Sequence, residues 1–522
     1  MVKVITAQQA AELIKDGMTV AMGGFGAYSG PDELLQAVAD RYAETGHPKG
    51  LTTVGGISTG NFDKVNGMGL SRLRADGLLD TVIAGHIGNP VDIANMVGAN
   101  KIAGYVLPLG VVIHLFRAMA GKKPGVLTTV GLGTYADPRN EGCIANERAR
   151  EQGRKVVELL EIDGEEYLFY KKIPMDICLI RGTYADEDGN ISLKHEAIVE
   201  AQLQIAAAVH NQGGTVIVQV EDIVQKGSIP PKEVRIHNSL VDYVVKARPE
   251  YHMQSYAEKS YRPELTGETK VPVNALAPMK MSLRKVIARR GAMELKPGCM
   301  ITRGIGIPSG VGLVANEEGI AEQVTLSLES GPIGGVPVEG TGFGGAANAE
   351  AIVSIPDTFD LYDGGILDMT CLGAAEIDKY GNVNVSKFGT RCTGPGGFIN
   401  ISQNTPKVCF MLSFTAGKPE LEIGGGELHI HKDGEGIKFV DKVQQITFSG
   451  DYARKTGQKI LYITERAVFE LTEQGVTLTE IAPGVDMEKD ILAHMGFRPA
   501  ISQNLKQMDP RIFREEKMGL SV

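Results

Sequence analysis

An acidic residue at the end of an apolar strand is the strongest candidate for chemistry in this sequence. The apolar run 324–328 favours a strand, and Glu329 stands at its end. Gly331, Gly334 and Gly335 follow, and they permit backbone angles closed to most residues while leaving no side-chain bulk around the carboxylate. A strand end of this kind can present one functional group to a ligand at close range. We therefore interpret Glu329 as a nucleophile.

Other potentially reactive side chains have plainer interpretations. Glu339, Glu350 and Glu376 are rival carboxylates, of which Glu350 and Glu376 fit helix or turn acids and Glu339 is the hardest to dismiss. The alternating pair His429 and His431 favours an exposed edge strand over a metal site, because the sequence suggests no third ligand. No metal is therefore expected.

Length and composition are typical of a globular protein of two or three domains. The chain has 522 residues, of which 43% are hydrophobic and 22% charged. The formal net charge of −10 argues against nucleic acid as the main partner, although one local basic patch would suffice for a phosphate-bearing ligand. The apolar stretches are too short for a membrane span, and the N-terminus lacks a signal-peptide pattern. Six cysteines without a Cys-x-x-Cys pair fit free thiols, so we expect a cytoplasmic protein.

One order of elements occurs twice in the chain. Near the start, the capping-box sequence Thr6–Gln9 begins a helix, and a turn leads to a strand at 18–22 and a glycine loop at 23–26. Later, a helical segment at 285–295 is followed by a turn, a strand at 299–302 and the loop 304–308. We interpret the basic run at 284–290 as a solvated face of this second helix.

A second similarity supports a duplication. The turn sequence 186–191 resembles 378–383, and the first half carries extra residues that include the polar stretch 137–166. Short apolar runs fit strands buried on both faces of a largely parallel sheet, with helices such as 31–42 and 110–120 covering them; the runs are 175–180, 215–220, 407–414 and 459–464. We therefore predict an α/β fold: two similar open α/β domains fused in one chain. The predicted boundaries are 1–225, a surface linker at 226–277 rich in charge and proline, and 278–522.

Several glycine-rich and acidic motifs occur in a fixed order along the chain. They are Val20–Gly26, Gly304–Pro308, Leu328–Gly331, Gly340–Gly345, Phe359–Gly365, Leu372–Asp378, Gly394–Gly397 and Thr464–Phe469. Together they resemble the family I CoA-transferases, specifically the single-chain acetate/propionate/lactate branch in which two subunit-like halves are fused. The similarity covers essentially the whole chain.

This resemblance implies an active site at the interface of the two domains, with Glu329 as the nucleophile. It implies CoA contacts from Gly304, Ile305, Gly306, Ile307, Pro308, Gly396, Gly397 and Asn400. An acyl pocket with oxyanion donors is expected from Gly23, Gly24, Phe25, Leu109, Gly344 and Gly345. Leu109 stands where we expect many relatives to carry Gln, and it cannot donate a side-chain hydrogen bond. Either a backbone N–H does that work, or activity and substrate choice differ.

The implied activity moves CoA between short-chain acids such as acetate, propionate, butyrate and lactate through a glutamyl-CoA thioester. CoA would be a substrate, and no permanently bound cofactor is expected. The expected partners are acyl-CoA and carboxylate molecules, with no nucleic acid and no membrane, and the resemblance implies a homo-oligomer, either a dimer or a tetramer. Two alternatives stay open, an acyl-CoA hydrolase on the same scaffold and a non-catalytic ligand-binding protein. A nicotinamide dehydrogenase ranks below both, because the acidic ribose partner of a dinucleotide loop is not evident.

Overall fold

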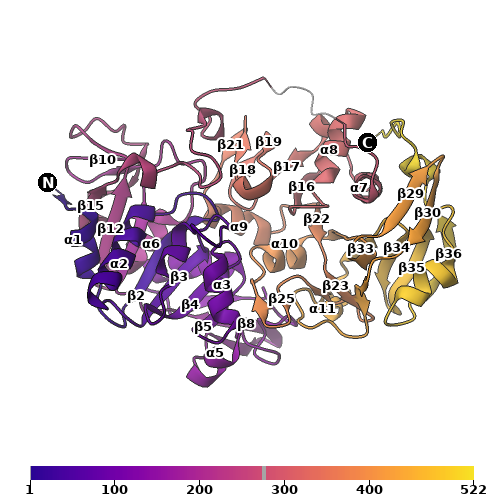
Figure 1. The fold of residues 1–522 in the computed structure, drawn as a ribbon, viewed down its shortest axis with the longest axis horizontal. Coiled ribbons are helices and arrows are strands. Elements are labelled where there is room, and N and C mark those ends of the chain that lie inside the picture. The colour runs from indigo at the N-terminus through magenta and orange to yellow at the C-terminus, as the bar shows by residue number, and fades with distance from the viewer. Residues whose placement is uncertain (1, 273–277, 522) are drawn as a thin grey trace. The chain divides into compact units, whose positions relative to one another are not determined.

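The computed structural model describes residues 2–272 and 278–521 (Figure 1). These residues form two compact units. Unit 1 contains residues 1–271, 329–360 and 386–400, and unit 2 contains residues 272–328, 361–385 and 401–522. Two stretches from the second half of the chain therefore belong to unit 1, and one of them begins at Glu329.

The stretch 226–277, predicted as a surface linker, contributes two strands. These are β14 (Val234–Ile236) and β15 (Tyr243–Lys246), and β15 lies within the large sheet of unit 1. Residues 273–277 of the predicted linker lie outside the described residues.

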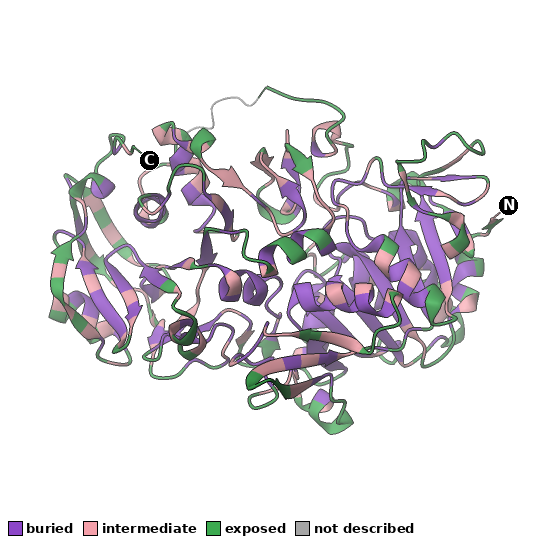
Figure 2. Cartoon of the chain, turned by 180° about the vertical axis from the view of Figure 1, so that it is seen from behind, coloured by how far each residue is buried: buried purple, intermediate pink, exposed green. Residues whose placement is uncertain are grey.

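Unit 1 is built on an eight-stranded sheet in which every neighbouring pair is parallel. In spatial order its strands are β1 (Lys3–Val4), β15, β12 (Thr215–Val220), β9 (Ile177–Arg181), β2 (Thr19–Phe25), β3 (Leu51–Ile57), β4 (Leu79–His86) and β5 (Ala103–Val106). Its strands are buried nearly throughout, as Figure 2 shows, which fits the continuous apolar runs in the sequence. The predicted parallel α/β architecture is confirmed for this unit.

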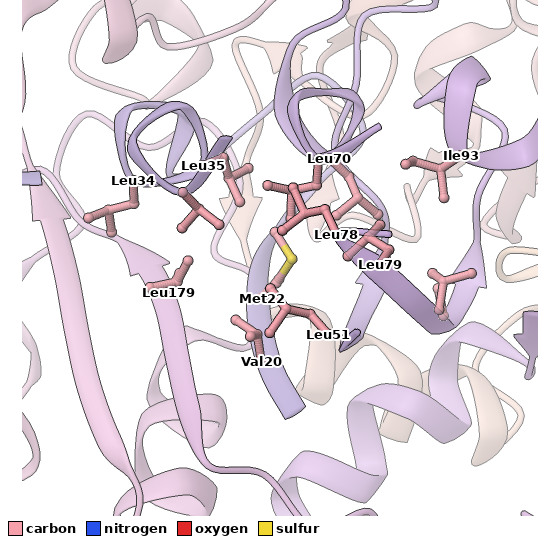
Figure 3. Close-up of a cluster of buried hydrophobic side chains, with 14 of the residues drawn as sticks. Val20, Met22, Leu34, Leu35, Leu51, Leu70, Leu78, Leu79, Ile93 and Leu179 are labelled. Carbon is pink, nitrogen blue, oxygen red and sulfur yellow. The ribbon is translucent and has the colours of Figure 1, made fainter. Parts of the chain in front are cut away.

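Helices cover both faces of this sheet. α1 (Ala7–Leu13), α2 (Asp32–Thr45) and α3 (Val91–Gly98) share one core with strand residues that include Val20 and Met22 (Figure 3). α4 (Leu109–Ala120) and α6 (Gln202–Asn211) pack together and contact β2, β3, β4, β9 and β12. The predicted capping box begins α1, since the Thr6 hydroxyl accepts from the Gln9 N–H and the Gln9 side chain accepts from the Thr6 N–H.

The extra residues of the first half form a separate small sheet. In spatial order its strands are β6 (Gly125–Thr128), β8 (Glu165–Lys171) and β7 (Val157–Ile162). The helix α5 (Glu147–Gln152) lies between β6 and β7 in the chain. A second small sheet contains β10 (Tyr184–Asp186), β11 (Ile191–Ser192), β13 (Asp222–Val224) and β14.

Unit 2 also has an eight-stranded sheet, which is mixed. In spatial order its strands are β17 (Thr325–Leu326), β16 (Met300–Arg303), β22 (Met369–Gly373), β27 (Lys407–Met411), β33 (Lys459–Ile463), β34 (Ala467–Thr472), β35 (Gly475–Ile481) and β36 (Ala500–Gln507). The first five are parallel, and the pairs β33–β34 and β34–β35 are antiparallel. The helices of the second half are α7 (Leu283–Ala292), α8 (Gly310–Glu318), α9 (Ile355–Asp363), α10 (Phe398–Asn404) and α11 (Gly450–Thr456).

The two units repeat one topology. The order β3-β2-β9-β12-β15 in unit 1 corresponds to β17-β16-β22-β27-β33 in unit 2, and α1 and α7 precede equivalent strands. The similar turns also match atom by atom. Asp186 accepts from the backbone N–H of Asp188 and Asn190 and from the Asn190 amide, and Asp378 makes the same three contacts to Tyr380 and Asn382.

One expectation for unit 2 is wrong. The basic run at 284–290 is not a solvated helix face, because Lys285, Arg289 and Arg290 are buried and only Arg284 of its basic residues is exposed. The buried cations pair with acids instead: Lys285 and Arg289 with Glu317, and Arg290 with Glu480. Within the described residues, no helix is long and apolar enough to cross a membrane.

Candidate active site

The backbone around Glu329 is fixed on both sides of the residue. On its N-terminal side, the Ser327 N–H donates to the Ile301 carbonyl at 2.8 Å and continues the pairing of β17 with β16. On its C-terminal side, the Ser330 hydroxyl donates to the Gly344 carbonyl at 2.6 Å. Gly331 has a φ of +115°, and a β-carbon there would overlap the Val353 carbonyl oxygen. The glycine is therefore required for the chain to turn directly after the acid.

The Glu329 carboxylate lies in a desolvated position. The side chain is half-buried, and the Gly397 N–H faces its carboxylate. Burial raises the pKa of Glu329 to about 7, an effect that the nearby Gly397 N–H opposes. A β-carbon on Gly397 would overlap Oε2 of Glu329 and would also lie 3.2 Å from Cζ of the buried Phe359. The absence of a side chain at Gly397 thus lets a backbone donor reach the carboxylate.

The glycine-rich turn that carries Gly397 is held by the residues around Leu109. The Gly396 N–H donates to the Gly85 carbonyl at 3.0 Å, and the Leu109 N–H donates to the Gly396 carbonyl at 3.0 Å. Asn400 is fully buried, and its side-chain oxygen accepts from the Gly110 N–H at 3.1 Å. Leu109 therefore contributes its backbone donor to the turn beside Glu329, and Asn400 fixes the first turn of α4.

The predicted acyl-side glycines lie together in unit 1. Phe25 is buried and its ring packs edge-on against Phe343, with ring centroids 6.1 Å apart. A β-carbon on Gly344 would lie 3.1 Å from the Phe25 ring, and one on Gly345 would lie 2.8 Å from the Tyr28 hydroxyl. Gly24 and Gly344 both have positive φ, at +118° and +112°. These positions accept only glycine without strain, so close packing of the two turns explains them.

The predicted CoA loop 304–308 belongs to unit 2. The Gly304 N–H donates to the Cys371 carbonyl at 2.8 Å, and Gly306 has a φ of +83°. Ile305 is 62% exposed, and the loop ends at the N-terminus of α8. An exposed apolar side chain beside a helix N-terminus suits a ligand with apolar and anionic parts. Glu329 and the other predicted site residues belong to unit 1.

The two histidines singled out in the sequence lie on a hairpin of unit 2. β29 (Glu420–Gly424) pairs with β30 (Glu427–Lys432), and His429 and His431 are exposed and pair with Glu427 and Glu422. In the described part of the chain, no cluster of three or more His, Cys, Asp or Glu side chains could hold a metal ion.

Comparison with known proteins decides the family. Residues 4–247 match the model of the family described as coenzyme A transferase. The caffeate CoA-transferase of Acetobacterium woodii is 46% identical, and the match covers 100% of this chain and 99% of that protein. The acetate CoA-transferase YdiF of Escherichia coli is 40% identical over 99% of this chain and 96% of its own length. This chain belongs to the coenzyme A transferase family.

Solved structures of a member of this family agree with the fold. The apoenzyme crystal structure of the acyl-CoA transferase YdiF has a TM-score of 0.93 and 39% identity, covering 100% of this chain and 98% of that one. A second crystal structure of the same transferase, described as a thioester complex with CoA, gives the same values. The prediction of a single-chain family I CoA-transferase with two α/β domains is confirmed.

One buried acid in this CoA-transferase was not predicted from the sequence. Glu200 lies just before α6, is 2% exposed, and its carboxyl faces Gly23, Gly24 and Gly56. Burial raises its pKa to about 8. The available signal was an isolated acid within the apolar segment 197–201, where a charged group should find a partner or stay neutral.

Proposed function

We propose that this CoA-transferase moves CoA between short-chain carboxylic acids, with Glu329 carrying CoA as a glutamyl thioester between two half-reactions. The single observation that supports this route best is the position of the Glu329 carboxylate. It is partly desolvated, the Gly397 N–H faces it, and it lies beside a position kept free of side-chain atoms.

Glu329 would form two covalent intermediates. A carboxylate oxygen attacks the acyl-CoA carbonyl, the carbon–sulfur bond breaks, and a mixed anhydride and CoA thiolate result. The thiolate then attacks the glutamyl carbonyl of the anhydride, which releases the first acid and leaves glutamyl-CoA. A second carboxylate reverses both steps and departs as its CoA thioester. Each step conserves the energy of the thioester.

Placement must supply most of the rate, because a carboxylate is a weak nucleophile. Holding nucleophile and thioester in register can contribute about 7–11 kcal/mol. Partial desolvation also helps, since a carboxylate with fewer water contacts is less strongly solvated before it attacks. The pKa of about 7 leaves a substantial ionised fraction of Glu329 at neutral pH, which the attack requires. The exposed loop 304–308 would contact CoA, and the turns at 23–25 and 344–345 would line the acyl side.

The names of the relatives support acids as the second substrate and do not fix their size. One relative is named for caffeate and another for acetate. We place short-chain acids first, since the acyl-side turns at 23–25 and 343–345 are already packed closely by Phe25 and Phe343. Efficient transfer to caffeate with none to acetate, propionate or butyrate would contradict this choice.

An intact-mass measurement tests the route. The wild-type protein should gain the mass of CoA after incubation with acetyl-CoA, and peptide mapping should place the adduct on Glu329. Glu329→Gln should abolish the adduct and lower turnover by at least about 10³-fold, because the nucleophile is lost. Glu339→Gln is the matched control, since it removes an exposed carboxylate from the same turn region.

Normal turnover by Glu329→Gln would refute the route. Release of CoA at the same rate with and without an acceptor acid would favour the hydrolase alternative. A wild-type protein inactive toward every acyl-CoA would favour a non-catalytic binding protein.

A further inference from the structure

Glu200 is a buried acid without the partners that such groups normally have. Neither carboxyl oxygen has a hydrogen-bond partner. The N–H groups of Ala201 and Gly24 face the carboxyl, but their geometry does not meet the criteria for a hydrogen bond. No basic side chain among the described residues pairs with it. A buried polar group left in this state costs stability, so it calls for an explanation.

Glu196, four residues earlier, shows how a structural acid is treated in the same segment. It is also buried, at 3% exposure, but it pairs with Arg181 Nε at 2.9 Å. Its second oxygen accepts from the Ser29 hydroxyl at 2.6 Å. Both carboxyl oxygens of Glu196 therefore have partners within the protein, whereas those of Glu200 do not.

The Glu200 carboxyl is surrounded by apolar side chains and by the backbone of glycine residues. Its Oε2 lies 3.6 Å from the position that a β-carbon on Gly23 would take, and its Oε1 lies 3.5 Å from the corresponding position on Gly56. The Gly56 position is also 3.2 Å from Leu109 Cδ1 and 3.1 Å from Ile113 Cδ1. At Gly23 and Gly56 the carboxyl therefore faces backbone without a side chain, while both of its oxygens are buried.

Leu109 links this carboxyl to the site of Glu329. Its side chain lies beside Gly56 and therefore beside Glu200. Its backbone N–H donates to the Gly396 carbonyl, and the N–H of the next residue, Gly397, faces Glu329. Leu109 is thus connected through these contacts to both acids of unit 1.

We propose that Glu200 is a specificity-determining residue that, as a neutral carboxylic acid, donates a hydrogen bond to an oxygen on the acyl chain of the substrate. The favoured substrates are then short hydroxy acids over unsubstituted acids of the same length. This inference rests on the proposed function, because it places the acyl group between Glu329 and Glu200. A raised pKa of about 8 keeps the carboxyl protonated at neutral pH, which supports its role as a donor.

The test compares acceptor acids that differ by one hydroxyl group. CoA transfer from acetyl-CoA is measured with lactate, 3-hydroxypropionate and propionate, and kcat/KM for each hydroxy acid is divided by that for propionate. The wild-type ratio should exceed one for at least one hydroxy acid. Glu200→Met, which keeps the length and removes the donor, should lower that ratio by about tenfold or more. Glu200→Gln retains a donor and should change the ratio by less than about threefold.

Thermal stability separates this role from a structural one. Glu200→Met should raise the Tm or leave it unchanged, since an apolar side chain replaces a buried polar group without partners. The matched control Glu196→Met should lower the Tm, because it leaves buried Arg181 without its acid. A lower Tm for Glu200→Met, an unchanged ratio in that variant, or a wild-type enzyme without preference for either hydroxy acid would overturn the proposal. The ratio reports CoA transfer by any route, so an absent adduct on Glu329 would refute the thioester route alone.

Discussion

At the scale of single residues, two acids of unit 1 have raised pKa values from the same cause and different proposed roles. Burial raises the pKa of Glu329 to about 7 and that of Glu200 to about 8. The Gly397 N–H faces Glu329, and the N–H groups of Gly24 and Ala201 face Glu200; each of these donors opposes the rise in pKa. The two carboxyls differ in exposure, because Glu329 is half-buried and Glu200 is 2% exposed. The more deeply buried carboxyl has the higher pKa, as desolvation predicts.

Gly397→Ala tests how closely the carboxylate of Glu329, the proposed nucleophile, is held. Gly397 does not have a positive φ, so alanine should be accepted by the backbone, but its β-carbon would overlap Oε2 of Glu329. The carboxylate must then move, and a misplacement of about 1 Å can cost on the order of 10²-fold in rate. We expect kcat to fall by about that factor, with the Tm nearly unchanged.

Gly424→Ala is the control for that variant. Gly424 ends β29, does not have a positive φ, and a β-carbon there would have no neighbour within 4 Å. Steady-state kinetics of both variants give the comparison. Wild-type kcat in Gly397→Ala would show that the carboxylate position is not set by this glycine.

At the scale of elements, α7 shows that a run of cations does not by itself indicate a solvated helix face. The run of cations fits a solvated helix face, yet Arg289 is fully buried and donates to the backbone carbonyls of Arg511, Ile512, Arg514 and Glu516. Its acid partner Glu317 lies on α8. The sequence around a residue does not indicate which backbone carbonyl groups of a distant segment it will contact. Burial of these cations could therefore not be inferred from the run itself.

Arg289→Met should loosen the C-terminal segment of unit 2. The change leaves four backbone carbonyls without this donor and removes one cation from Glu317, and the free energy of unfolding should fall by about 3 kcal/mol. Arg284→Met, on the same helix but exposed, should change it by less than about 0.5 kcal/mol. Urea unfolding and limited proteolysis of residues 510–521 measure both effects. Equal stability of the two variants would contradict this account of α7.

At the scale of the whole molecule, the duplicated topology shows where the proposed nucleophile lies in the chain. β17 corresponds to β3 in the repeat, so Glu329 follows a strand whose counterpart is followed by Ser58 and Thr59. The first repeat therefore carries no acid at the equivalent place. One half of the duplicated fold provides the proposed nucleophile, and the other provides Leu109 and Glu200.

The sequence predicts the parts of this molecule that depend on local patterns. Apolar runs such as 215–220 and 407–414 locate the central strands, and the glycines after Glu329 predict the turn that presents it. Contacts between segments that are distant in the sequence cannot be predicted from local patterns. The strand β15 is only four residues long, too short to produce a recognisable periodicity in its stretch of sequence. The unusual position of Glu200 is visible only in the folded structure, where Gly23 and Gly56 lie beside it.

The stability of the molecule should depend on pH through the two buried acids. Each has a folded-state pKa above its ordinary value of 4.5, so between about pH 4.5 and 8 the folded state holds protons that the unfolded state has lost. Stability from these groups therefore falls as pH rises through that window, and the cost is fully present above it.

The double variant Glu200→Gln, Glu329→Gln lacks both groups. Its Tm minus the wild-type Tm should increase by about 2–4 °C or more between pH 5 and pH 8. Differential scanning calorimetry at both pH values gives this difference, and Glu339→Gln, which removes an exposed acid, should show no such trend. A difference that stays constant with pH would mean that neither carboxyl keeps its proton on folding.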